Sequence, residues 1–269
     1  MLINNDKMPE SYLAHHVFDD IEYMRDFYDR LSDRCFYFIP SGTRGIANYA
    51  SYIYMSYQGT LKSIKTLLEF GNINDALVLV RKLYDDVLVD IYIDVLRKDQ
   101  FDLDKNFIVE DVDNWINSKH RIPSLKKILK YLEKSPKSKD LYPFFGWDTY
   151  LKHNREILDD SVHSNRFTRI LLNCSTVYIK DREKHLDGIA VILKQIFTIH
   201  LAFTFYMNEQ YFMASDYMDS IDCGINPPDG SQSWIALYAQ EAFDKYIAPR
   251  KDLSTFIIEH CCLDIASNR

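Results

Sequence analysis

Apolar residues recur at a helical period over most of this chain. The clearest run covers residues 74–98, where one stripe is apolar and the opposite side carries charged residues. A spacing of three and four places side chains on one face of an α-helix. The pattern therefore predicts an amphipathic helix against a core, with the stripe formed by Leu77, Val80, Leu83, Tyr84, Val87, Leu88, Ile91, Tyr92, Val95 and Leu96.

Weaker runs of the same period predict the remaining helices. We expect them at about 19–32, 44–70, 110–118, 123–134, 146–178 with a polar break, 181–218 and 234–246. Gly71 suits the end of the helix over 44–70, and Asn72 or Asn74 is expected to cap the next helix by accepting its free N–H groups. So short a connection predicts an antiparallel hairpin. FYFIPSG at 36–42 is expected to be extended.

The composition favours an all-α fold. Only 8 Gly and 8 Pro occur among 269 residues, which leaves few of the turn residues that a β-sandwich or barrel needs. We expect a helical bundle over 44–207, an N-terminal segment with a short helix over 1–43, and a C-terminal helical extension over 208–269.

Charge and cysteine content narrow the class of protein. The formal net charge of −7 means that the average surface repels phosphate, so nucleic-acid binding requires a local basic patch. Five cysteines form no CxxC pair and follow no recognisable secretion signal, which predicts a cytoplasmic protein. The most apolar run, 189–207, contains Lys194, Gln195 and His200. We therefore expect a buried bundle helix there and no membrane partner.

The stretch LDDSVHSN, residues 158–165, gathers candidate chemistry. On a continuous helix, Asp159, His163 and Arg166 share a face, since they are four and three residues apart. Histidine changes protonation near neutral pH, a carboxylate orients it, and arginine holds a phosphate. A metal-independent ribonuclease needs these groups. The alternative is that His163 caps a helix or makes a buried hydrogen bond, with Asp159 on a solvated edge.

Two segments together resemble a known family. VRKLYDDVLVDIYI at 80–93 and LDDSVHSN at 158–165 are similar to the pattern of HEPN-like bacterial proteins. The resemblance implies an all-α, commonly homodimeric bundle, an RNA-cleaving toxin or defence effector, and an antitoxin or defence partner protein. It implies that His163 is the active-site histidine. It also implies that Arg81, Asp85 and Asn165 contact the substrate.

The sequence departs from the family pattern at the catalytic arginine. The upstream arginine is Arg155, eight residues before His163, and a continuous helix separates them by about 12 Å along its axis. Arg166 or Arg155 is thus the expected phosphate clamp, with Asp159 orienting the imidazole. The alternative function is a catalytically inactive HEPN-like module that binds a protein or nucleotide. Arg81 and Asp85 equally fit an ordinary i,i+4 ion pair.

The remaining histidines do not predict a metal site. His15 and His16, His185, His200 and the segment 259–262 lack the paired spacing of a closed zinc or di-iron site. We expect no metal and no cofactor.

Overall fold

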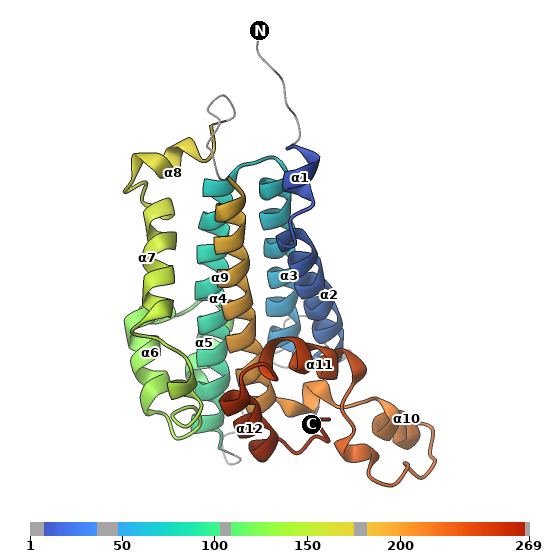
Figure 1. Ribbon diagram of the computed structural model, residues 1–269. Coiled ribbons are helices and arrows are strands. Elements are labelled where there is room, and N and C mark those ends of the chain that lie inside the picture. The colour runs from blue at the N-terminus through green and yellow to red at the C-terminus, as the bar shows by residue number, and fades with distance from the viewer. Residues whose placement is uncertain (1–7, 37–47, 103–108, 175–181, 267–269) are drawn as a thin grey trace. The chain divides into compact units, whose positions relative to one another are not determined.

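The computed structural model describes residues 8–36, 48–102, 109–174 and 182–266, and its regular elements are helices (Figure 1). The β-type contact among these residues is one isolated bridge between Met213 and Ile235. The all-α prediction is confirmed. Most of the FYFIPSG stretch lies outside the described residues.

Helices occur in most of the predicted ranges. Their bounds are α1 Glu10–Leu13, α2 Val17–Arg34, α3 Tyr49–Glu69, α4 Ile73–Gln100, α5 Glu110–Ile116, α6 Leu125–Lys134, α7 Tyr150–Val162, α8 Phe167–Leu171, α9 Arg182–Met207, α10 Asp216–Asp222, α11 Leu237–Ala242 and α12 Lys251–His260. However, α9 ends at Met207, a separate helix α10 begins at Asp216, and α1 and α12 were not predicted. The helix predicted over 234–246 begins as α11 and passes into a π-helical turn, Phe243–Ile247, before α12. The polar break predicted within 146–178 separates α7 from α8.

The chain forms two compact units, and each is made of two stretches of sequence. Unit 1 comprises Met1–Asp90 and Phe145–Phe197, and unit 2 comprises Ile91–Phe144 and Thr198–Arg269. The division falls inside α4 and α9, whereas the expected boundaries were at 43/44 and 207/208. The long helices α4 and α9 each contribute one half to unit 1 and the other half to unit 2. Neither unit is therefore a continuous stretch of sequence.

An aromatic cluster fills the centre of unit 1. α2 and α3 lie side by side and antiparallel (Figure 1). The buried ring of Tyr28 on α2 lies 6.1 Å from that of Tyr54 and 5.2 Å from that of Tyr57, both on α3. The ring of Phe197 on α9 is 5.6 Å from Tyr28. The Tyr57 hydroxyl donates to the carbonyl of Asp86 at 3.0 Å, so α3 also bonds to α4.

The turn between α3 and α4 matches the predicted hairpin but uses a different cap. Gly71 has φ +74°, and its N–H donates to the carbonyl of Leu68, as a helix-ending glycine does. At the start of α4, Asn173 Oδ1 accepts from the N–H groups of Asn74 and Asp75 at 2.9 and 3.3 Å. The capping asparagine therefore comes from a segment 99 residues away rather than from Asn72 or Asn74.

α9 is long and apolar enough to cross a membrane. Of its most apolar window, 78% is buried inside the protein. The core helix of a soluble protein has the same length and composition. The buried position agrees with the interpretation of this run as a bundle helix.

Unit 2 has its own apolar centre and its own polar ties. The ring of Phe205 lies 4.2 Å from that of Phe212 and 5.6 Å from that of Phe243. The buried Asn208 donates to Asp94 Oδ2 at 2.5 Å, which joins the end of α9 to α4. The segment before α11 also contacts this centre, because Ala236 N–H donates to the carbonyl of Phe212 at 2.7 Å.

Candidate functional site

The stretch LDDSVHSN forms the end of α7 and the turn after it. His163 is the C-cap residue, and its N–H donates to the carbonyl of Asp159 at 3.0 Å. Ser164 adopts φ +50°, and the N–H of Asn165 donates to the carbonyl of Asp160 at 3.2 Å. This pattern ends a helix by satisfying its last carbonyl groups. The helix therefore stops at Val162, and the backbone of His163 has the capping role that the sequence left as an alternative.

Asp159 bonds to arginines rather than to the imidazole of His163. Its Oδ1 accepts from Arg81 Nε at 2.7 Å, and its Oδ2 lies 3.7 Å from Arg155 Nε. Arg81 also forms an i,i+4 ion pair with Asp85. The expectation that Asp159 orients His163 therefore differs from the structure. The physical reason is that the guanidinium group of Arg81, 11% exposed, draws the nearby carboxylates toward α4.

The environment of Arg81 combines burial with compensating charge. Burial by itself lowers its pKa, but the hydrogen bonds and charges of Asp85 and Asp159 outweigh burial and raise the pKa. The guanidinium lies 5.8 Å from the ring centre of Tyr84, and burial raises the pKa of that phenol to about 12. Arg81, Asp85, Asp159 and Arg155 thus form one charged cluster, which we call the Arg81 cluster. It joins α7 to α4.

Arg166, the other expected phosphate clamp, lies after the end of α7, in the turn that leads into α8. It is the N-cap residue of α8, its side chain is 70% exposed, and its Nε lies 2.8 Å from Asp160 Oδ2. The amide of Asn165 also contacts Asp160, at 3.5 Å. His163 and Asn165 are exposed. Arg155 and Arg166 therefore pair with different carboxylates, Asp159 and Asp160.

A cavity of about 740 Å³ lies in unit 1 beside Arg166. Its walls come from α7, α8 and the first half of α9, with Leu77 from α4. The basic residues on its wall are Arg166, Arg169, Lys184, His153 and His185, and Asp187 is the acidic one. Asn154, Thr168 and Gly188 also line it, and the apolar part of the wall consists of Leu77, Ile157, Leu171, Leu172, Ile189, Val191 and Ile192. We call this space the cationic cavity.

The basic groups of the cationic cavity repel one another. Burial lowers the pKa of Arg169, and the charge of Arg166 adds to that effect, while Asp160 opposes it. Burial also lowers the pKa of His185, and the charges of Arg169 and Arg182 act in the same direction. A bound anion would relieve this repulsion. Sequence reasoning missed Arg169, Lys184, His153 and His185, because these residues come from three helices and form no contiguous motif.

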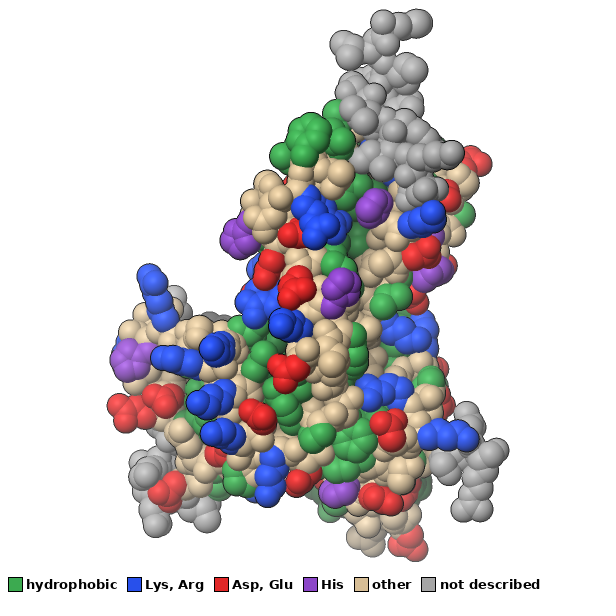
Figure 2. Space-filling model, turned by 60° about the vertical axis from the view of Figure 1, so that its left-hand side comes forward, with side chains coloured by type: hydrophobic (Ala, Val, Ile, Leu, Met, Phe, Trp, Pro, Cys, Tyr) green, Lys and Arg blue, Asp and Glu red, His purple; other side chains and the backbone are tan. Residues whose placement is uncertain are grey.

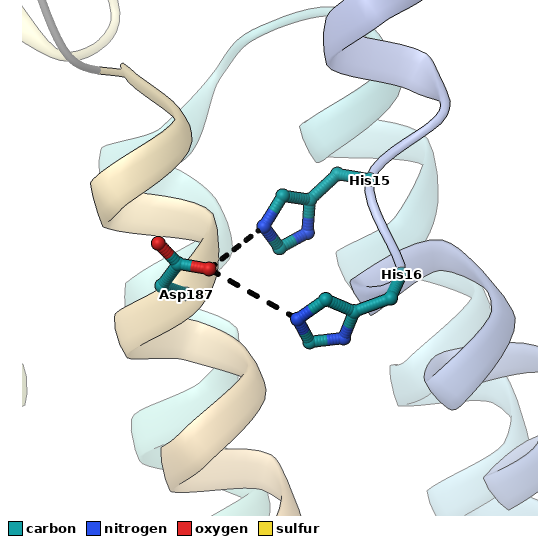
Figure 3. Close-up of side chains that lie close together, drawn as sticks. All are labelled: His15, His16 and Asp187. Atoms are coloured by element: carbon teal, nitrogen blue, oxygen red, sulfur yellow. Dashed lines mark hydrogen bonds and ion pairs between the residues drawn. The ribbon is translucent and has the colours of Figure 1, made fainter.

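His15, His16 and Asp187 lie close enough together to suggest a metal site (Figure 3). His15 Nε2 is 3.0 Å and His16 Nε2 is 3.9 Å from Asp187 Oδ1. However, His15 Nδ1 accepts from the N–H of Val17 at 3.2 Å, so the proton of a neutral His15 is on Nε2, facing Asp187. A metal ion would need that nitrogen deprotonated.

The two imidazole rings are stacked, with centres 4.4 Å apart and planes 28° from parallel, and the Nε2 atoms of both face Asp187 Oδ1. His16 also contacts Asp20 through Nδ1 at 2.9 Å. The trio is better described as a hydrogen-bonded contact that holds the start of α2 against α9. We assign no metal ion to it.

The Arg81 cluster makes a specific prediction for stability. Replacing Arg81 by Ala leaves Asp85 and Asp159 without their shared cation, so we expect a loss of about 2 kcal/mol in the free energy of unfolding. The matched control is Lys82→Ala, which breaks an exposed i,i+4 pair with Asp86 on the same helix and should cost well under about 1 kcal/mol. Urea unfolding of both variants measures the difference. Equal losses would contradict a structural role for the cluster.

Comparison with known proteins does not assign the chain to a family. No protein-family model, no curated protein and no solved structure matches the chain. The similarity to HEPN-like proteins consequently depends on the two short segments alone.

Proposed function

We propose that unit 1 binds a phosphate-bearing nucleotide in the cationic cavity, either as a free nucleotide or as one residue of an RNA chain. The observation that carries this proposal is the lining: five basic side chains, one acidic side chain and apolar walls around about 740 Å³. Ligand sites of this size are mostly apolar with a few polar groups that orient the ligand. A nucleotide has the matching parts, an anionic phosphate and a flat base.

The positions of the basic and apolar residues indicate where the phosphate and the base of such a ligand would bind. Arg166 and Arg169 lie three residues apart at the start of α8 and present two guanidinium groups to one phosphate, which arginine binds through paired N–H donors. Lys184 and His185 approach from α9. The apolar side chains of Ile157, Leu172 and Ile192 give the base a surface on which to pack. Binding in this form needs no change in the Arg81 cluster.

A second candidate function is RNA cleavage, favoured by the exposed His163 three residues from Arg166 and by the HEPN-like resemblance. In this reaction His163 removes the proton of a ribose 2′-hydroxyl. The 2′-oxygen attacks the adjacent phosphorus, the bond to the 5′-oxygen breaks, and that oxygen takes a proton. The products are a 2′,3′-cyclic phosphate and a 5′-hydroxyl.

The contacts of the two arginines favour Arg166 over Arg155 as the phosphate clamp of this reaction. Arg166 lines the cationic cavity, whereas Arg155 belongs to the Arg81 cluster. Asp159 then positions Arg81 and α7 rather than the imidazole. In the proposed cellular setting, the chain acts in the cytoplasm as a homodimer of a toxin or phage-defence system with an antitoxin or defence partner. A homodimer would supply a second His163 as the proton donor.

Nucleotide binding is tested with Arg169→Gln. We expect adenosine monophosphate to bind the wild type and to bind this variant about tenfold more weakly, because one charge-assisted contact to the phosphate is lost. Lys152→Gln, an exposed position on α7 outside the cavity wall, is the matched control and should bind as the wild type does. Isothermal titration calorimetry gives the affinities. Equal affinities for the three proteins, or no binding to the wild type, would contradict the proposal.

The same titration has an expected pH dependence. Because burial and neighbouring arginines lower the pKa of His185, it is neutral at pH 7 and gains charge only below the usual histidine range near 6.5. An anionic ligand favours the charged form, so the affinity for sulfate, which unlike adenosine monophosphate keeps its charge over this range, should rise as the pH falls from 7 toward 5.5. The free protein should lose stability over the same range, since its unfolded state binds the proton more readily.

RNA cleavage is tested separately with His163→Ala. Loss of cleavage of a labelled RNA, with adenosine monophosphate affinity unchanged, is the expected result because the exposed imidazole makes no contact with the cavity wall. Toxicity on expression in cells should disappear in parallel. If wild type and variant behave alike in both assays, the enzyme function is excluded and nucleotide binding remains as the function to test.

A further inference from the structure

One segment of this acidic protein is strongly basic. Residues 119–139, KHRIPSLKKILKYLEKSPKSK, contain eight Lys and Arg and a single acidic residue, Glu133. The segment therefore carries a formal charge of +7, while the other 248 residues together carry −14. Charge separated in this way creates a local positive field that the net charge of −7 conceals.

The structure turns these basic residues outward from unit 2. On the inner side of α6, Ile128 and Leu132 are buried. The Tyr131 hydroxyl and Ser135 Oγ both donate to Asp99 Oδ2 on α4, at 2.8 and 2.6 Å. These contacts fix the rotation of α6 about its own axis. Its polar side is consequently presented to solvent in a defined orientation.

Three lysines form a row along the outer side of α6. Lys126, Lys130 and Lys134 are exposed and four residues apart, so they follow one another at about 6 Å per step along the helix. Lys127 stands beside the row, and the exposed residues at its two ends are Lys119, Arg121, Lys137 and Lys139. None of these eight makes an ion pair within the described parts of the chain. Figure 2 shows blue side chains crowded together on this part of the surface.

We infer that this row, with the basic residues at its ends, binds the phosphate backbone of a nucleic acid. Regularly spaced cations along a rigid helix match a ligand that carries one negative charge per residue, and this electrostatic binding to phosphates needs no apolar contact. This surface belongs to unit 2 and goes beyond the proposed nucleotide site. It requires neither cleavage nor occupancy of the cationic cavity.

The exposed side chains favour a nucleic acid over other polyanions. No large apolar side chain of residues 119–139 is exposed, because the apolar side of α6 faces inward. Stable attachment to a membrane surface takes an apolar or lipid anchor in addition to basic residues. A protein partner is held mainly by apolar and aromatic residues at the centre of its interface. A surface with eight exposed cations and one exposed carboxylate, Glu133, fits the phosphate backbone best.

The test compares two triple variants that change the net charge equally. Lys126, Lys130 and Lys134 are replaced by Gln in the first, which keeps helix propensity. Exposed lysines outside the segment, Lys62, Lys152 and Lys251, are replaced by Gln in the control. Fluorescence anisotropy measures the affinity for a short single-stranded RNA and a DNA of the same sequence between about 50 and 200 mM salt.

We expect the wild type and the control to bind with similar affinity, and the α6 variant at least tenfold more weakly. For single strands, the logarithm of affinity falls with the logarithm of salt by about 0.7 per phosphate contact, so the slope of the α6 variant should be shallower by about 2. Equal weakening in both variants, or none in the α6 variant, would overturn the inference. So would binding of the wild type to phosphatidylserine vesicles but to neither nucleic acid.

The outcome is independent of the proposed nucleotide site. Adenosine monophosphate affinity is measured on the same α6 variant and should equal that of the wild type, because none of the three lysines lines the cationic cavity. A protein that binds RNA through α6 but not adenosine monophosphate would refute the cavity proposal alone. The reverse result would refute the α6 inference alone.

Discussion

The guanidinium group of Arg81 determines where α7 lies in unit 1. α7 buries only Leu151, Leu158 and Ser161, so apolar burial contributes little to its attachment. A buried cation, by contrast, is strongly destabilising unless carboxylates neutralise it. Asp85 comes from the same helix as Arg81, but Asp159 comes from α7. Asp85 by itself balances the charge of Arg81, and the second carboxylate, Asp159, ties α7 to α4 through its hydrogen bond to Arg81 Nε.

The cationic cavity follows from this mode of attachment. Where α2 packs on α3, apolar side chains fill the space between the helices. α7 is held instead by the Arg81 cluster and by the hydrogen bond from Asn154 to Gln195 on α9. Space remains beyond these contacts, and α8 crosses the end of α7 above it (Figure 1). Asp159 and Asp160 of α7 are already paired with arginines, and basic groups dominate the wall. The ion pairs that hold α7 in place thus also account for the excess of basic groups in the cationic cavity.

The helices were predictable from the sequence, whereas the site was largely not. The apolar period locates a helix because burial of one face is a local pattern, which is why α2, α3 and α4 lie where predicted, while α9 begins where predicted and ends earlier, at Met207. The end of α7 depends on one residue, Ser164 in a left-handed conformation, and serine rarely adopts it. The cap of α4 and the cavity wall depend on contacts between distant segments. The basic run at 119–139 is visible in the sequence, but its orientation depends on packing against Asp99.

Amide hydrogen exchange of Arg81→Ala beside the wild type tests the central claim most directly. If the Arg81 cluster holds α7 in place, amides of residues 150–162 should exchange much faster in the variant, while those of α2 and α3 keep their protection. Lys82→Ala should leave all three helices unchanged. An Arg81→Ala protein in which α7 exchanges as slowly as in the wild type would contradict the account.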